Sequence, residues 1–266
     1  MEEKKIFKVT SNPIVRTPRD TSKIMLDVII ALVPALGVGA YMFGMNVAIL
    51  LVVNVAACVV FEWAYRKLMK KNTSVGDLSA VVTGVLITCV MPSAAPWWVG
   101  LIGSFFAIIV VKQLYGGIGK NFLNPALAAR AFMSAAYAAY MTTWAVPSTL
   151  RSVVDATTMA TPLSYLYAGE AMPEYLGLGN LFLGSIPGSI GEISALAILV
   201  GGAYLLIRKV ITWRIPTAFI GTVAVLTLVF GHEGYGNFEW MLYNILSGGL
   251  LLGAFFMATD YSTSPV

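Results

Sequence analysis

Six residues in one short stretch of the chain have side chains or backbone freedom suited to binding a ligand. The stretch GGIGKNFLNPALAARAF (116–132) holds three glycines, two asparagines and an arginine: Gly116, Gly117, Gly119, Asn121, Asn124 and Arg130. Glycines let a backbone turn tightly and approach a ligand closely, and an asparagine before a proline predicts a helix N-cap. The pattern indicates either a site for an anionic or polar ligand at a helix N-terminus or a capped connection in which the arginine is paired locally. It is not GxGxxG after a strand, so a dinucleotide-binding fold is excluded.

A second polar stretch, DATTMATP (155–162), combines a carboxylate, hydroxyls and a proline. Hydroxyls beside a carboxylate could form a nucleophile with its base, but no histidine or lysine lies near them. The only histidine, His232, falls in a different predicted loop. Hydrolase chemistry therefore has little support. Taken alone, these residues predict a capped, turn-forming loop.

The composition decides what surrounds these two stretches. Of 266 residues, 58% are hydrophobic and 11% are charged, against roughly 25% charged in soluble domains. Too few charges remain to cover a water-facing surface, so the chain predicts an all-α polytopic membrane protein. Residues 1–23 form a polar arm without a signal-peptide core, and residues 24–266 predict one transmembrane bundle. Cys58 and Cys89 lie singly in apolar runs, which predicts small buried side chains and no disulfide, zinc site or iron–sulfur cluster.

Apolar runs long enough for a bilayer predict a bundle of about eight to ten transmembrane helices. The eight spans that we expect are Ile24–Phe43, Val47–Tyr65, Leu78–Met91, Trp97–Val111, Pro125–Met141, Ile190–Ile207, Ile215–Phe230 and Trp240–Ala258. The third is short and ends in MPSAAPWW, where prolines stop a helix and tryptophans favour the interface. We expect it to be a broken or re-entrant helix.

The distribution of basic residues predicts the orientation. With the N-terminus in the cytoplasm, all but two of the 17 lysines and arginines fall in the arm or in inner loops, including Lys112. The exceptions are Arg130, within a span, and Arg151. The positive-inside rule therefore places a long loop, about residues 142–190, on the extracytoplasmic side. Charge sorted in this way follows from topology and indicates no nucleic-acid-binding surface.

Two further features leave alternatives open. The segments TGVLITCVMPSAAP (83–96) and LGAFFMATDYSTSP (252–265) align without gaps, which fits an inverted repeat with broken helices or a chance likeness of two helix ends. Acidic residues in or near spans, among them Asp27, Glu62 and Asp77, suggest cation handling. Pairing with interfacial lysines and arginines is the other interpretation.

Together, DATTMATP, GGIGKNFLNPALAARAF and FFMATDYSTSP resemble the family of the D subunit of the Rnf ion-translocating electron transport complex. That family is similar to the B subunit of the sodium-translocating NADH:quinone reductase. Its members carry the pattern Asp-x-x-(Ser/Thr)-x-Ala-Thr, and a flavin transferase links FMN through its phosphate to the last threonine. The resemblance implies covalent FMN on Thr161, with Asp155, Thr158 and Ala160 as the rest of the motif. Met159 stands where glycine is usual.

The same resemblance implies a function and partners. The chain is expected to be an electron-relaying membrane subunit that links reduced ferredoxin to NAD⁺ and contributes to Na⁺ or H⁺ translocation. The A, B, C, E and G subunits of the Rnf complex are its implied partners, in a bacterial or archaeal cytoplasmic membrane. A noncovalent flavin, riboflavin, is also implied, and the six residues of the 116–132 stretch are its candidate site. No catalytic acid–base pair and no metal site are expected in the chain itself.

Two rival interpretations remain at this stage. One is a subunit of a quinone-reducing sodium pump, and the other is a solute channel or transporter with inverted repeats and no redox centre. Family members continue through further apolar helices where this chain ends in MATDYSTSPV. We therefore expect a truncated sequence or a missing C-terminus.

Overall fold

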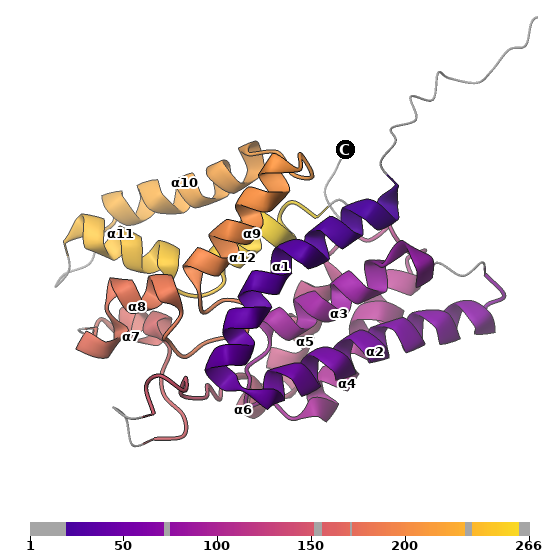
Figure 1. Ribbon diagram of the computed structural model, residues 1–266, viewed down its shortest axis with the longest axis horizontal. Coiled ribbons are helices and arrows are strands. Elements are labelled where there is room, and N and C mark those ends of the chain that lie inside the picture. Colours follow the sequence, from indigo (N-terminus) through magenta and orange to yellow (C-terminus); the bar gives the residue numbers. More distant parts are fainter. Residues whose placement is uncertain (1–19, 72–74, 152–155, 171, 232–235, 261–266) are drawn as a thin grey trace, which may run out of the picture.

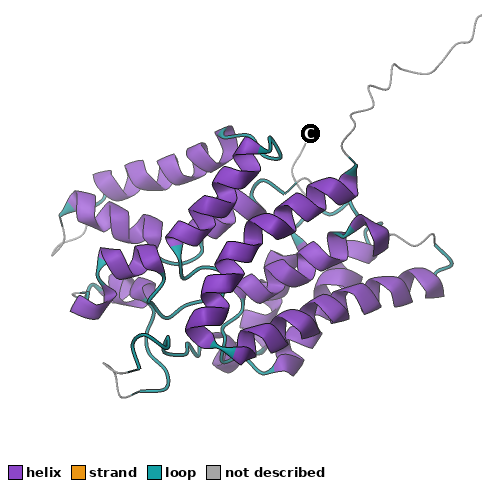
Figure 2. Ribbon diagram, viewed as in Figure 1, coloured by secondary structure: helices purple, strands orange, loops and turns teal. Residues whose placement is uncertain are grey.

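The computed structural model is a bundle of helices (Figure 1) and describes residues 20–71, 75–151, 156–170, 172–231 and 236–260. Within these residues there is no β-strand, only two isolated bridges. Figure 2 shows helices joined by loops throughout the described chain. This confirms the all-α class. Asp155 and His232, named above, lie outside the described residues.

Each predicted span overlaps at least one described helix. The bundle is built from α1 (Thr21–Phe43), α2 (Met45–Leu68), α3 (Ser79–Val90), α4 (Trp97–Phe105), η2 (Phe106–Gln113), α5 (Pro125–Ala136), α6 (Ala138–Met141), α9 (Ala195–Ile207), α10 (Arg214–Val229), α11 (Asn237–Leu246), α12 (Leu250–Leu252) and η4 (Gly253–Met257). Shorter elements lie in the connections: η1 (Val75–Asp77), α7 (Pro162–Ala168), η3 (Glu174–Leu176) and α8 (Leu178–Leu183).

Two helices, α1 and α2, are by themselves long and apolar enough to cross a bilayer. The pair α11 and α12–η4 makes a third candidate span if it is counted as one element bent by 63° at residues 247–249. The predicted eighth span is therefore broken in the middle. Other apolar helices, including α3, α9 and α10, are shorter than a full span.

The third predicted span is the short, interrupted helix that its sequence indicated. α3 has 12 residues, nearly all buried, and it packs mainly against α2, α5 and α1. It ends at Val90, after which Met91 is extended. Backbone that leaves a helix at membrane depth is tolerated only where protein or water covers it. Here protein provides that cover, because Met91 and Pro92 are buried.

Two predicted boundaries are wrong. The sixth span begins at Ala195 and not at Ile190, since residues 184–194 form turns that end in the N-cap Ser194, whose side chain accepts a hydrogen bond from Ala197 N. The fourth extends to Gln113 as the π-helical η2, so Lys112 belongs to a helix and is buried. A lone lysine at the end of an apolar run looks like a loop residue when its partner is far away in sequence.

The two ends of the bundle differ. At one, which we call the basic end, α1 begins and α2 and α9 end. At the other, the loop end, α1 turns into α2 at Gly44 and the connection that contains α7 and α8 begins. Ser148 N donates to Met42 O (2.9 Å), which fixes this connection against the end of α1. The described part of the predicted extracytoplasmic loop thus begins at the end opposite the helix termini that carry Lys23, Lys67 and Arg208.

Candidate functional site

Thr161 lies at a position that the backbone defines well. The preceding motif residues form an antiparallel bridge, Thr158 with Ala145, supported by Val146 N donating to Thr157 O (3.2 Å) and Met159 N donating to Trp144 O (3.1 Å). Thr161 is then the N-cap of α7, but its side chain makes no capping hydrogen bond. Its hydroxyl is therefore not committed to the helix that it precedes.

Two cavities meet at Thr161. The inner one, of about 110 Å³, is lined by Arg130, Trp144, Thr161, Pro162, Leu163, Ile186, Pro187, Gly188, Ser189, Glu192, Ile193, Gly248 and Gly249. The outer one, of about 530 Å³, is lined by Thr142, Thr143, Trp144, Thr158, Met159, Ala160, Thr161 and Ser164. Thr161 and Trp144 belong to both. The motif residues Thr158 and Ala160 thus face the same space as the threonine.

Arg130 reaches the inner cavity from α5 and contacts two other segments, the end of α3 and the loop that precedes α9. Its Nη1 donates to Val90 O (2.6 Å), Ser189 Oγ (3.0 Å) and Glu192 Oε1 (3.0 Å). The Val90 carbonyl belongs to the last turn of α3, where carbonyls lack helical partners and the helix dipole favours a cation. The arginine therefore has the local partners that an intramembrane cation requires.

The loop that carries Ser189 and Glu192 lies beside the end of α3. Ile190 N donates to Met91 O (3.0 Å) and Gly191 N to Cys89 O (2.8 Å), while Ser189 bridges Pro92. A Cβ on Gly191 would lie 2.5 Å from Cys89 Cβ, so this close approach needs glycine. Sequence reasoning did not single out this loop. The run GSIPGSIGEIS (184–194) was its only signal, because small and polar residues there precede an apolar helix.

The structure places the glycines of the 116–132 stretch at the basic end, away from Arg130. Gly116, Gly117 and Gly119 have φ of 112°, 94° and 78°, so the predicted tight turning is confirmed. Asn124 is the predicted N-cap, its Oδ1 accepting from Ala126 N (3.0 Å) and Leu127 N (3.4 Å). With its side-chain amide turned so that the nitrogen faces the Gly117 carbonyl, Asn121 donates from Nδ2 to Gly117 O (3.1 Å).

The two asparagines line a different cavity from the one at Thr161. It has about 20 Å³ and includes Ser79, Lys112 and Asp260 in its wall. Asn124 Nδ2 donates to Asp260 Oδ2 (3.2 Å). This volume is close to that of a single water molecule. The six residues are therefore not gathered at one place, and a noncovalent flavin at them stays a prediction.

A buried ion pair joins α2 to η2 near the basic end. Lys112 Nζ lies 2.7 Å from Glu62 Oε2, with side chains 2% and 0% exposed, and it also donates to Ser79 Oγ (2.6 Å). Ser79 Oγ in turn donates to Asp77 Oδ1 (2.6 Å). Asp27, on α1, pairs with Arg208 at the end of α9 (3.3 Å). Glu62 and Asp27 thus pair with basic side chains, and Asp77 reaches Lys112 through the Ser79 hydroxyl.

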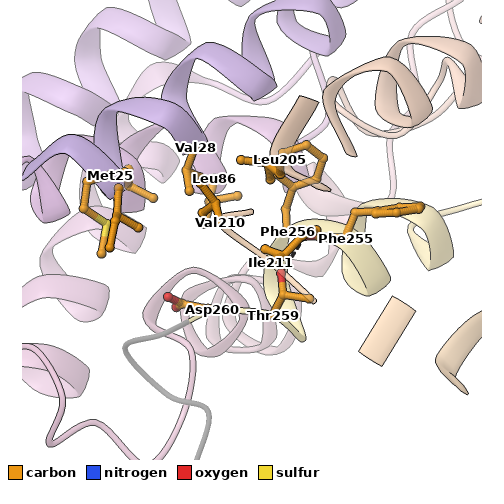
Figure 3. A pocket seen from close by; sticks show the side chains of 12 residues that line it. Met25, Val28, Leu86, Leu205, Val210, Ile211, Phe255, Phe256, Thr259 and Asp260 are labelled. Atoms are coloured by element: carbon orange, nitrogen blue, oxygen red, sulfur yellow. Dashed lines mark hydrogen bonds between the residues drawn. The ribbon is translucent and has the colours of Figure 1, made fainter. Parts of the chain in front are cut away.

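A further cavity of about 30 Å³ lies between α1, α3, α9 and η4 (Figure 3). Its wall is mostly apolar, with Met25, Leu86 and Phe256 among its side chains, and Thr259 and Asp260 supply the polar groups. Among the described residues no group of three histidines, cysteines or acids is placed to hold a metal ion. Cys58 and Cys89 are both buried and form no disulfide.

These features define a class of protein, the polytopic all-α membrane proteins with broken helices and buried ion pairs. At one end of the bundle, Thr161 lines two neighbouring cavities. The profile of the NQR2, RnfD, RnfE family matches residues 8–266. The chain belongs to this family.

Named relatives agree with this assignment. The chain is 48% identical over 263 residues to the D subunit of the Na(+)-translocating ferredoxin:NAD(+) oxidoreductase complex of Acetobacterium woodii, covering 97% of this chain and 78% of the relative. It is 40% identical to the D subunit of the proton-translocating ferredoxin:NAD(+) oxidoreductase complex of Clostridium ljungdahlii, covering 99% and 81%. It is 36% identical to the D subunit of the ion-translocating oxidoreductase complex of Rhodobacter capsulatus, covering 96% and 79%.

Proposed function

We propose that this chain is the electron-relaying membrane subunit of an ion-translocating ferredoxin:NAD⁺ oxidoreductase complex, and that it carries FMN as a phosphoester on Thr161. The observation that carries the proposal is the position of Thr161 where two cavities meet, with its hydroxyl unused by the helix that it caps. The family supports the rest, since relatives that the chain matches over most of their length are named as the D subunit of such complexes.

The residues present suit a flavin. The outer cavity, of about 530 Å³, falls in the range of roughly 300–1,000 Å³ typical of small-molecule sites. Trp144 offers an aromatic face in both cavities, and Arg130 offers a cation in the inner one.

In this proposal the protein positions the cofactor, and the cofactor carries out the electron transfer. FMN supplies one- and two-electron transfer when bound. Thr161 holds it by a covalent link, so that it cannot dissociate between turnovers. The backbone bridge between residues 144–146 and 157–159 keeps the linked threonine at the cavity mouth. Apolar side chains such as Ile186 and Ile193 line part of the inner cavity.

Attachment from the extracytoplasmic side is also part of the proposal. A flavin transferase needs an accessible hydroxyl in a segment that can enter its active site. Thr161 precedes Pro162 at the start of a short helix of the loop end, and the outer cavity beside it is open to the surface at exposed residues such as Thr142 and Thr143. Other complex subunits must supply the iron–sulfur and nicotinamide sites.

The transported ion is left as Na⁺ or H⁺. The relatives at 48% and 40% identity are named for different ions, sodium and proton, so similarity does not choose between them. Turnover of the purified complex in the presence and absence of sodium would make that choice.

Covalent flavin gives the first test. The chain is co-expressed with its complex and an active flavin transferase, denatured, and separated on a gel that is scanned for flavin fluorescence. We expect a fluorescent band for the wild type and for the control Thr142→Ala, which removes a hydroxyl from the same outer cavity but lies outside the motif. Thr161→Ala should abolish the fluorescence. A dark wild-type band, or a fluorescent Thr161→Ala band, contradicts the proposal.

A further inference from the structure

The wall of the inner cavity contains one cation, Arg130, and only one of its three guanidinium nitrogens donates hydrogen bonds to described residues. All three hydrogen bonds of the Arg130 side chain that the structure describes leave from Nη1. Within the described residues its Nε and Nη2 donate to no acceptor, and the side chain is 30% exposed. A guanidinium has five N–H donors. Arg130 lines the cavity that it shares with Thr161, so a ligand bound there lies beside a guanidinium with unused donors.

The setting of Arg130 is rigid. Its Nη1 contacts come from the end of α3 and from the 188–192 loop, two segments that are hydrogen-bonded to each other. The partner Glu192 is itself confined, since its side chain is 10% exposed and a Cβ on Gly249 would lie 2.6 Å from Glu192 Oε1. The charge of the arginine is thus held in one place with little freedom, which is what a charge needs in order to act on a neighbouring group without reorganising.

The cavity also holds an opposing charge. Glu192 lines the same wall and lies 3.0 Å from Arg130 Nη1. Both charges face a space with apolar walls, where electrostatic interactions are screened less than in water. Charge near a flavin ring is one of the means by which a protein tunes its electron affinity.

We propose that Arg130 and Glu192 are an opposed pair of positioning residues that set the reduction potential of the flavin on Thr161, Arg130 raising it and Glu192 lowering it. This inference rests on the proposed function. The physical reason is that a flavin gains electron density on reduction, and a fixed cation favours that state whereas a fixed carboxylate disfavours it. It also assigns Arg130 to the covalent flavin and not to a noncovalent one at the 116–132 stretch.

The sign of the effect separates this role from a structural one. Arg130→Gln and Glu192→Gln break the same ion pair, so a residue pair that only fastens α5 to its neighbours predicts the same change in both variants. The proposed role predicts opposite changes. The experiment is a redox titration of the covalent flavin in the purified complex, followed by its absorbance, with covalent loading measured on the same sample.

We expect Arg130→Gln to shift the midpoint potential to more negative values and Glu192→Gln to shift it to more positive values. A tenfold change in the reduction equilibrium is about 59 mV for a one-electron step, and each variant should reach at least that size. Arg130→Lys, which keeps a cation, should stay near the wild-type potential. Arg208→Gln is the control, because Arg208 also pairs with an acid but lines neither cavity.

Several results would overturn the inference. Shifts of the same sign in Arg130→Gln and Glu192→Gln, or an unchanged potential in either, would leave only a fastening role. If Arg130→Gln yields no assembled complex, Glu192→Gln and Arg130→Lys decide, and a Glu192→Gln potential that does not rise contradicts the proposal. A wild-type complex without covalent flavin on Thr161 fails differently: the proposed function falls and this inference falls with it.

Discussion

Breaking the buried ion pair between Glu62 and Lys112 should cost far more stability than replacing both of its members. Lys112 Nζ and Glu62 Oε2 are 2.7 Å apart, and neither side chain is more than 2% exposed. At that separation the mutual attraction is about 6 kcal/mol for an effective dielectric constant of ~20. Desolvation costs several kcal/mol for each ion, so the net contribution of the pair to the free energy of unfolding is close to zero.

Removing one partner upsets that balance, because the other charge stays buried. We expect Glu62→Leu and Lys112→Met each to lower the free energy of unfolding by roughly 3–5 kcal/mol. Lys112→Met should fall at the lower end of that range, since Arg66 Nε still lies 3.7 Å from Glu62 Oε1. The double variant Glu62→Leu/Lys112→Met should cost much less than the sum of the single changes.

The assay is a double-mutant cycle on the purified protein in detergent micelles, with unfolding followed by circular dichroism during denaturant titration. A coupling free energy of at least about 2 kcal/mol is expected for residues of one buried network. Additive single and double effects, or single variants within about 0.5 kcal/mol of the wild type, would refute the reasoning. They would mean that water reaches the pair and that burial does not decide its energetics.

Two further changes follow from local geometry. Gly201→Ala should destabilise the protein by about 1–3 kcal/mol, because its new Cβ would collide with Ala31 O on α1 and overpacking has that cost. The matched control is Gly221→Ala on α10, where the new Cβ would have nothing within 4 Å. The control should be neutral or stabilising by up to about 1 kcal/mol. Equal thermal stabilities for the two variants would contradict the packing of α1 on α9. Asn124→Ala should cost about 1 kcal/mol through loss of the N-cap hydrogen bonds of α5. Asn124→Ser is the control, because it keeps a capping oxygen and, like the Ala variant, lacks the Nδ2 that donates to Asp260. An Ala variant as stable as the Ser variant would show that the cap contributes nothing.

The positions of most helices were predictable because a bilayer imposes an apolar composition on the segments that lie in it. Each predicted span overlaps a described helix, although the fifth and eighth are each divided in two, and the short third span ends where its prolines and tryptophans indicated. The Asn124 N-cap was predictable for a similar reason, since an asparagine before a proline has a local structural meaning. Features that depend only on neighbouring residues, such as helix caps and helix ends, could thus be predicted from the sequence.

Features that depend on distant contacts could not be predicted. Nothing near Lys112 in the sequence shows that Glu62, fifty residues earlier, lies beside it. Likewise the 116–132 stretch suggested that Arg130 would act with its neighbouring glycines, whereas the structure brings Arg130 to Ser189 and Glu192, about sixty residues later. Arg130 lies about one and a half helical turns after the N-cap Asn124, and it therefore lines a different cavity from Asn124.

Peptide mass spectrometry of the mature complex tests the central claim most directly. The complex is isolated after co-expression with an active flavin transferase, digested, and the peptide that contains Thr161 is fragmented. We predict a mass increase equal to FMN minus water, located on Thr161 and not on Thr157, Thr158 or Ser164. An unmodified peptide, or an adduct located on one of those three residues, would contradict the account.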